Sequence, residues 1–542
     1  MSLLSLVLFL PAAGALALLA LPRGRDNATR VAAIGIALAT FLLSLGFLSN
    51  FEGNGDFEIV DHAPWIPSFG IEYHVGLDGL SIYLVLLTTF LVPIVFLASW
   101  RSITERVREY FVLFLLLETG MLGAFASLDL FLFYIFWELT LIPMALLVGM
   151  YGGERRIYAA VKFFIYTAVG SLLMLVAILV LYVTHGRMTG DYTMNLLELM
   201  GTRLAPRTEM LAFLAFALAF AIKVPLFPFH TWLPDAHVEA PTGGSVILAA
   251  ILLKLGTYGF LRFAVPLFPN AAAAAAPALA ALAIIGIVYG ALVAMVQRDF
   301  KKLVAYSSVS HLGYVVLGIA SGTLAGWQGG LFAMISHGLT TGALFLLVGM
   351  VYDRLHTRRI ADYGGLARRA PLYTAAFLFV TLGSIGLPGL SGFVGEFLVL
   401  LGTFARSHVW AAVAGVGVVL GALYMLWVVE RVFFGRVANA AAKPLGDLTL
   451  REAFVLAPVL AGILVLGVQP GLVLEKSEAS LERIRESARL SQGDWSGEEF
   501  LRAAWHGDAD RGGAFDRAAA HEPSVASTGD GVRAPDAKVA ER

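Results

Sequence analysis

The sequence predicts an all-α polytopic membrane protein with about 14 transmembrane helices. Of its 542 residues, 58% are apolar and only 14% are charged, and the mean hydropathy is +0.79. Soluble domains average about 25% charged residues, so the composition argues against a soluble globular protein. The formal net charge of −1 gives no electrostatic support to nucleic-acid binding.

Apolar runs long enough for membrane helices recur along the chain. A crossing helix needs about 20 mostly apolar residues. The predicted spans lie near residues 3–21, 31–49, 76–99, 110–127, 129–150, 159–184, 209–231, 241–263, 272–296, 303–321, 327–351, 371–404, 409–430 and 453–472. The alternative for the first run is a cleavable signal peptide, but no basic segment precedes the run, and Arg23 and Arg25 follow it. We therefore expect a membrane helix there.

Basic residues are distributed unevenly between alternate connections. One set of connections carries 20 Lys and Arg residues, and the other carries five. The basic-rich set comprises residues 23–30, 101–108, 155–156, 298–302, 354–369 and 431–451. The five in the other set are Arg187, Arg203, Arg207, Arg262 and Arg406. The positive-inside rule then predicts an even number of spans and both termini on the outer side.

Three lysines lie within apolar spans, where a charge costs roughly 2.5–3.5 kcal/mol on insertion scales and marks an ion or proton pathway. Lys162 lies near the inner end of its span, beside Arg155 and Arg156, so we expect it to reach the lipid headgroups. Lys223 and Lys254 lie too deep for that. We interpret these two lysines as functional.

Three acids and two histidines occupy similar settings. Glu138 has no basic neighbour in sequence and therefore needs a partner on another helix. Glu118 is open to two interpretations, a functional acid or a local helix–helix hydrogen-bonding residue. His311 and His337 are likewise either packing residues or titratable groups of a pathway, and Glu396 is a further candidate acid.

Two spans are interrupted. Residues 222–228 read IKVPLFP, with a lysine just before two prolines, and residues 382–389 read LGSIGLPG. Proline removes a helical hydrogen bond and clashes with the preceding turn, and broken helices at membrane depth occur only inside protein or along a wet cavity. Paired interruptions predict an inverted repeat and its transport site. Spans 4–8 and 9–13 would form the two halves.

This organisation predicts five regions. They are N-terminal helices 1–3 (residues 1–109), a first repeat of helices 4–8 (110–263), a second inverted repeat of helices 9–13 (264–435), helix 14 (436–474) and a polar tail (475–542). The tail carries 24 charges in 68 residues, about 35%, against about 11% before it. Residues 475–490 are compatible with a short charged helix, and we expect disorder beyond Ser491. We interpret the tail as a dispensable extension.

Several stretches together resemble a known family. They are AIKVPLFPFHTWLPDAHVEAPTGGSVILAAILLKLGTY from Ala221 to Tyr258, LFYIFWELTLIPM around Glu138, KFFIYT from Lys162, RDFKKLVAYSSVSHLGYV through His311 and GLPGLSGFVGEF through Glu396. These closely resemble the subunit M family of bacterial respiratory NADH:quinone oxidoreductase (complex I), across nearly all of residues 1–472. The tail departs from the pattern, because family members end soon after their last helix.

The resemblance implies a proton-pumping subunit of the membrane arm, built from two inverted five-helix repeats. By resemblance, Glu138 is the acidic partner on the fifth span, and Lys223 is the broken-helix lysine that it controls. Lys254 would be the central relay lysine. Burial disfavours a charged lysine and a nearby carboxylate favours it, so loosening the Glu138–Lys223 pair would release a proton towards Lys254.

The resemblance also assigns the end of the pathway. His311 and His337 would be later relay groups, and Glu396 would be the terminal acid of the second broken helix, exchanging protons with the outer side. Neighbouring family members usually have lysine at the position of Glu396, and L-type chains usually have histidine at that of Lys254. Both residues therefore favour the M type.

Redox chemistry is expected to belong to other chains. The sequence has no cysteine, which excludes disulfides, thiolate zinc sites and cysteine-ligated iron–sulfur clusters here, and it has no nucleotide-binding glycine motif. We therefore expect no metal and no cofactor in this chain. NADH, flavin, iron–sulfur clusters and quinone would belong to partner subunits in a bacterial inner (cytoplasmic) membrane, whose redox chemistry drives protons outward.

Three other interpretations remain open. A subunit of a multisubunit cation/proton antiporter would show sodium-linked exchange without NADH oxidation. A subunit of a membrane-bound hydrogenase or formate-oxidising complex would have a metal-containing catalytic partner. In a purely structural interpretation, the buried charges only hold helices together, and neutralising them would damage assembly rather than pumping.

Overall fold

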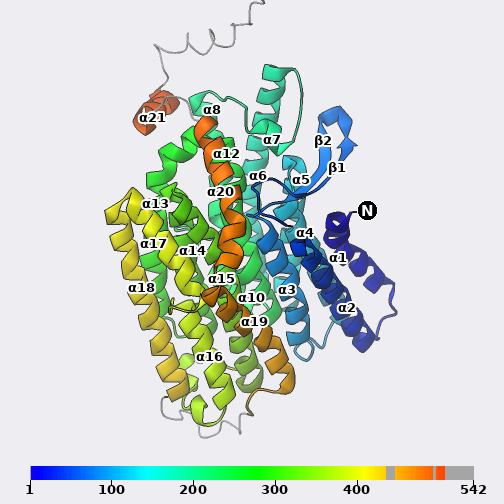
Figure 1. The fold of residues 1–542 in the computed structure, drawn as a ribbon. Coiled ribbons are helices and arrows are strands. Elements are labelled where there is room, and N and C mark those ends of the chain that lie inside the picture. The colour runs from blue at the N-terminus through cyan, green and yellow to red at the C-terminus, as the bar shows by residue number, and fades with distance from the viewer. Residues whose placement is uncertain (1, 50, 435–445, 492–495, 507–542) are drawn as a thin grey trace, which may run out of the picture.

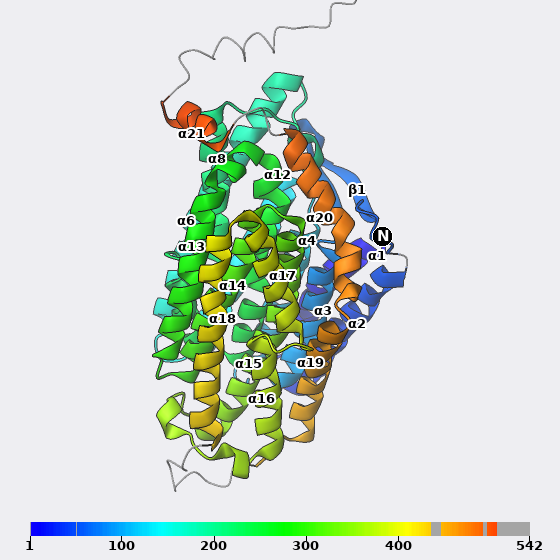
Figure 2. The same ribbon diagram turned by 60° about the vertical axis from the view of Figure 1, so that its left-hand side comes forward.

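The computed structural model describes residues 2–49, 51–434, 446–491 and 496–506, and shows a bundle of long helices with a two-stranded hairpin at one end (Figures 1 and 2). Eleven helical stretches in these ranges are long and apolar enough to cross a membrane. Two shorter apolar helices, α3 (Ile82–Ala98) and α16 (Pro371–Ser384), accompany them. The predicted polytopic helical fold is confirmed, while the number of crossings stays a prediction.

The bounds of the elements follow the predicted spans closely. The first part of the chain holds α1 (Leu3–Ala20), α2 (Asp26–Ser44), β1 (Ile59–Ile66), β2 (Ile71–Leu77), α3, α4 (Val107–Ala126), α5 (Leu130–Tyr151), α6 (Arg156–Thr189) and α7 (Leu196–Leu199). The middle part holds α8 (Pro206–Lys223), α9 (Trp232–Glu239), α10 (Thr242–Ile247), the π-helix η3 (Leu248–Leu252), α11 (Leu253–Gly259), the π-helix η4 (Phe260–Ala264), α12 (Val265–Leu267), α13 (Pro269–Met295) and α14 (Phe300–Ser321). The last part holds α15 (Leu324–Leu355), α16, α17 (Ser391–Arg406), α18 (His408–Val429), the π-helix η7 (Glu430–Phe434), α19 (Leu450–Val468), α20 (Gly471–Ser491) and α21 (Gly497–His506). Short 3-10 helices are η1 (Leu45–Ser49), η2 (Pro67–Phe69), η5 (Ile360–Asp362) and η6 (Leu366–Arg368).

The two predicted helix breaks share one hydrogen-bond pattern. Between α8 and α9, backbone N–H groups donate to backbone carbonyls from Val224 to Phe220, from Leu226 to Ala221 and from Phe229 to Leu226. Between α16 and α17, they donate from Ile385 to Thr381, from Leu387 to Leu382 and from Leu390 to Leu387. The spacings are the same in the same order. Prolines at the first break, and Pro388 with left-handed glycines at the second, thus accompany the same hydrogen-bond pattern.

Two aspartates begin helices α5 and α14 in the same way. The Asp129 carboxylate accepts two backbone N–H bonds at the start of α5, and Asp299 does the same at the start of α14. The backbone of each also pairs with the connection after the next helix, at Asn195 and Arg359 respectively. Burial raises the pKa of the Asp129 carboxyl to about 6, although backbone N–H donors oppose the shift.

A buried ion pair joins the first connection to the end of the α10–α12 segment. Arg262, on η4, is only 2% exposed and pairs with Asp78, which lies just after β2 and is also 2% exposed. The guanidinium additionally lies near Tyr258, whose hydroxyl accepts from Nε at 3.2 Å. Counting Arg262 among the basic residues of the connections was therefore wrong. Its charge is neutralised inside the protein and contributes nothing to the surface that sets orientation.

Replacing Asp78 with asparagine is expected to destabilise the protein by about 3–5 kcal/mol, because an uncompensated buried guanidinium remains. The matched control is Asp56→Asn, which breaks the exposed pair with Arg483 and should cost about 0–1 kcal/mol. Thermal inactivation of the detergent-purified protein measures both. Equal losses in the two variants would contradict the structural role of the Asp78–Arg262 pair.

The segment between α2 and α3 contains an antiparallel hairpin, although the sequence analysis predicted no strand there. Strands β1 and β2 pair with His62 opposite His74, and a register shift follows Pro64. The hairpin contacts α1, α4 and α5. At its base, the backbone N–H of Leu128 donates to the His74 carbonyl at 2.8 Å.

The polar tail begins as a packed helix. Residues Val473, Ser477, Leu481, Ile484 and Ala488 of α20 are buried at helical spacing, and α20 packs against α12 and α15. At its start, Lys476 Nζ donates to the carbonyls of Phe51 and Glu52 at 3.1 and 2.9 Å. This segment is therefore part of the bundle rather than a loose extension.

A second tail helix, α21, lies where the sequence analysis expects disorder. Its Phe500 and Ala504 share one face and are buried, and α21 packs on α8 and α13. Disorder beyond Ser491 is thus the wrong prediction for Gly497–His506, because one apolar stripe was hidden in a charged composition. Residues 507–542 lie outside the described residues.

Candidate functional site

Lys254 lies on α11, between the π-helices η3 and η4, and its side chain is fully buried. Its Nζ atom donates to the Ala249 carbonyl oxygen, 2.6 Å away on η3. A π-helix departs from the regular α-helical hydrogen-bond pattern and is frequent at functional sites. The widened helix therefore supplies a backbone acceptor to a lysine removed from solvent.

A second hydrogen bond connects Lys254 to the C-terminal half of the bundle. Its Nζ lies 2.7 Å from Nδ1 of His337, a buried residue of α15 that is 83 positions away in sequence. A charged lysine can only donate, so Nδ1 accepts and the neutral ring carries its hydrogen on Nε2. Nε2 is buried and has no partner among the described residues.

His311 and Glu396 continue from His337. The ring centroids of His337 and His311 lie 5.8 Å apart, and His311 Nδ1 lies 2.9 Å from Glu396 Oε1. The other nitrogen of His311 faces the Tyr424 hydroxyl at 3.4 Å. Glu396 is 9% exposed and follows the break before α17. Lys254, His337, His311 and Glu396 are called the buried line below.

The break between α16 and α17 leaves room for the Glu396 carboxylate. Gly386 adopts φ +78° there, a left-handed conformation that favours glycine. A Cβ atom at Gly386 would lie 3.0 Å from Glu396 Oε2. The absence of a side chain at this position thus lets the carboxylate lie against the break.

Lys223 forms a separate cluster at the last residue of α8. It is fully buried, and its Nζ donates to the Thr140 hydroxyl at 3.2 Å. The ammonium lies 5.1 Å from the ring centroid of Trp137 and 5.9 Å from that of Phe163. Aromatic faces attract a cation, and the carbonyl end of a helix does so as well. Neutral groups, namely a hydroxyl, two aromatic rings and the carbonyl end of α8, therefore stabilise the positive charge of Lys223.

Among the described residues, Glu138 makes neither a hydrogen bond nor an ion pair with Lys223. Trp137 and Thr140, three residues apart on α5, share the face that meets Lys223, whereas Glu138 is turned by about 100° from Trp137. In the described part of the chain, no ion pair within 4.0 Å joins Glu138 to Lys223. One Glu138 carboxylate oxygen is buried without a partner. The direct pair that the sequence analysis expected is absent from this arrangement.

The six predicted residues therefore fall into two groups. Four form the buried line, and the other two, Glu138 and Lys223, lie on neighbouring helices without touching. Among the residues placed by the structure, no hydrogen bond joins Lys223 to Lys254. Helices α8 and α11 nevertheless pack closely, since a Cβ at Gly256 would lie 2.7 Å from the Phe220 carbonyl oxygen.

Two further histidines of the first broken helix were missed. His230 and His237 are buried, and neither ring nitrogen of His237 has a partner among the described residues. The His237 ring stacks on Phe345 of α15, with centroids 4.5 Å apart. Both lie in HTWLPDAH, directly after the prolines. Polar residues beside a predicted break were the signal that could have identified them.

The structure also places Glu118 and Lys162, which were not assigned to the predicted pathway. Glu118 is fully buried on α4, and neither carboxylate oxygen has a partner in the described ranges. Lys162 is partly exposed, and its Nζ pairs with Asp235 at 2.8 Å and donates to the Thr231 carbonyl at 3.0 Å. Lys162 thus contacts the first break, whereas its expected contact with lipid headgroups stays a prediction.

Comparison with known proteins follows this geometry. Residues 127–421 match the family described as NADH:quinone oxidoreductase/Mrp antiporter, and residues 58–124 match the amino terminus of NADH-ubiquinone oxidoreductase chain 4. NADH-quinone oxidoreductase subunit M of Rhodobacter capsulatus is 48% identical, over 88% of this chain and 94% of that protein.

Solved structures agree with these matches. A chain of respiratory complex I from Thermus thermophilus is 38% identical with a TM-score of 0.82, covering 90% of this chain and all of that one. A chain of the Mrp complex from Dietzia is 25% identical with a TM-score of 0.76, covering 95% of this chain and 54% of that one. The chain therefore belongs to the NADH:quinone oxidoreductase/Mrp antiporter family, with relatives named subunit M.

Proposed function

We propose that this chain is a proton-translocating membrane-arm subunit of an NADH:quinone oxidoreductase. The buried line carries the proposal, because it places a lysine, two imidazoles and a carboxylate in succession inside a bundle of apolar helices. Each of these groups can bind or release a proton. Buried ionisable groups in membrane helices are expensive and mark proton pathways.

The proton would move along the buried line by successive donation. Lys254 Nζ gives a proton to His337 Nδ1, and the Nε2–H of His337 is then free to leave. The gap to His311 contains no direct hydrogen bond in the described structure, so a water molecule or a turn of the ring must bridge it. His311 then donates through Nδ1 to the Glu396 carboxylate.

Entry into the line would be controlled at the first break. In this arrangement Lys223 contacts Thr140 and aromatic rings, and no carboxylate directly contacts its buried charge. A shift of α5 that brings Glu138 to Lys223 would favour the charged lysine. Alternation between the two arrangements would load and unload Lys223.

We also propose that residues 110–263 and 264–435 are the two inverted repeats. The matching hydrogen bonds of the two breaks and the two aspartate-capped helices support this division. Ser2 and Lys476 both bond to the connection between α2 and α3, at Asp61 and at Phe51 respectively. Because Ser2 precedes the first predicted span and Lys476 follows the last one, their contacts with the same connection favour an even number of crossings, with the outer side assigned by the basic connections.

Gentle detergent purification of the chain with its associated subunits tests the assignment. We expect NADH:quinone activity and co-purifying membrane-arm subunits. The redox chemistry would come from the co-purifying subunits, because this chain has neither a nucleotide-binding glycine motif nor a cysteine. Sodium-linked exchange without NADH oxidation would instead show an antiporter subunit. A metal-containing catalytic partner without NADH oxidation would show a hydrogenase-type complex.

A further inference from the structure

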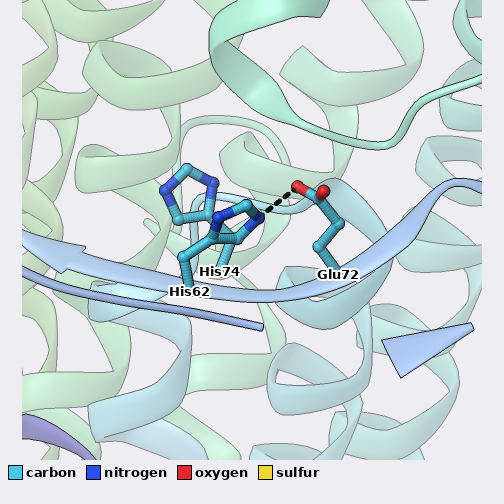
Figure 3. A group of neighbouring side chains, drawn as sticks. All are labelled: His62, Glu72 and His74. Carbon is cyan, nitrogen blue, oxygen red and sulfur yellow. Dashed lines mark ion pairs between the residues drawn. The ribbon is translucent and has the colours of Figure 1, made fainter. Parts of the chain in front are cut away.

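Three side chains of metal-ligand type meet on the β1–β2 hairpin (Figure 3). His62, Glu72 and His74 each offer one ligand atom, and these atoms all lie within 4.8 Å of one another. His62 Nε2 and Glu72 Oε2 are already 2.9 Å apart, and the two imidazole centroids are separated by 4.7 Å.

The strand register explains why these three meet. His62 on β1 is directly opposite His74 on β2, so both side chains lie on one face of the hairpin. Glu72 is two residues before His74, and alternate residues of a strand share a face. The pattern therefore fixes three donors on one side of a regular element.

The cluster is held by the surrounding protein. His74 is only 8% exposed, and its Nδ1 is buried without a hydrogen-bond partner in the described ranges. The backbone N–H of Glu72 donates to Asp129 at 3.0 Å, and Asn195 Nδ2 approaches Glu72 Oε2 at 3.4 Å. Ligands carried by a fixed element and supported by neighbours suit a metal site. His62 is half exposed and leaves a path for entry.

Two imidazoles and one carboxylate select the ion. Mg²⁺ and Ca²⁺ prefer oxygen ligands, whereas Zn²⁺ accepts histidine nitrogen and carboxylate oxygen and commonly uses three protein ligands plus water. Ligand atoms around tetrahedral Zn²⁺ are about 3.4 Å apart, so the three donors, which lie within 4.8 Å of one another, need only small side-chain shifts to surround the ion. We propose that His62, Glu72 and His74 bind Zn²⁺ at the hairpin. The absence of cysteine excluded thiolate sites only.

Zinc titration of the purified, chelator-treated complex tests the site. Compared with wild type, His62→Gln and Glu72→Gln should each lose one bound Zn²⁺ or bind it about tenfold or more weakly. The control His408→Gln removes an exposed histidine at the start of α18 and should bind as wild type does.

A second variant separates loss of a ligand from damage to the hairpin. His62→Cys supplies a thiolate, which is a good zinc ligand, so it should retain the bound ion that His62→Gln loses. With Co²⁺ as the probe, His62→Cys should add a thiolate-to-metal absorption band. Wild-type zinc binding in both glutamine variants, or equal loss in His62→Cys and His62→Gln, would overturn the proposal.

Discussion

Replacing Lys254 with methionine is expected to reduce proton translocation by about a hundredfold or more. A positioned proton-transfer group contributes about 10²–10⁴-fold to a rate. Methionine has a similar length and is apolar, so the fully buried site should still fill. The substitution removes the donor to His337 Nδ1 and to the Ala249 carbonyl. The pathway is then interrupted where the two halves of the bundle meet.

The measurement is NADH-driven proton uptake by inverted membrane vesicles, per amount of assembled complex. Lys302→Met is the matched control, because Lys302 is a partly exposed lysine near the start of α14, outside the buried line. It should pump at the wild-type rate. A Lys254→Met complex that assembles and pumps as wild type does would remove Lys254 from the pathway. Loss of assembly in Lys254→Met alone would favour the purely structural interpretation.

Lys223→Met is expected to give the second large effect, a loss of pumping of similar size with assembly preserved. Lys223 is the fully buried lysine at the first break, and no other described cation lies in its cluster with Thr140 and Trp137. Without it, the proposed route loses the group that would pass a proton from the first break towards Lys254. Glu138→Gln should also reduce pumping sharply, because it removes the acid that would recharge Lys223.

Thr140→Val distinguishes the role of the lysine from that of its surroundings. Valine keeps the shape of threonine but removes the acceptor of the Lys223 hydrogen bond, a change worth about 1.5 kcal/mol at the lower end of the range for a charged donor. It should therefore slow pumping by about tenfold. The same vesicle assay applies. If Lys223→Met pumps at the wild-type rate while Thr140→Val is severely impaired, the proposal that Lys223 carries the proton and Thr140 only supports it would be contradicted.

Hydropathy was sufficient to predict the helices and the lysines of interest, because a charge stands out in a run of 20 apolar residues. It could not show which of these residues touch. Lys254 and His337 are 83 positions apart, and their contact depends on how α11 and α15 pack. The rotation of α5 likewise decides that Thr140, and not Glu138, faces Lys223. When every face of a helix is apolar, the sequence does not show which face turns towards a given neighbour.

Other features escaped prediction for different physical reasons. Arg262 lies at the end of a span, where surface and buried positions have the same sequence signature, and only its pairing with Asp78 reveals burial. The hairpin strands are short, and their histidines and acids resemble an ordinary polar connection. In α21, Phe500 and Ala504 form a single apolar stripe amid charges. Each case needed tertiary contacts that single-sequence patterns do not contain.

The most direct test of the central claim is the proton translocation rate of the Glu396→Gln complex, measured per assembled complex in sealed vesicles. Glutamine keeps the shape and hydrogen-bonding capacity beside His311 but cannot take up and release a proton at neutral pH. If protons travel along Lys254, His337, His311 and Glu396, translocation should fall about a hundredfold and recover substantially in Glu396→Asp. A Glu396→Gln complex that translocates protons at the wild-type rate would contradict the account.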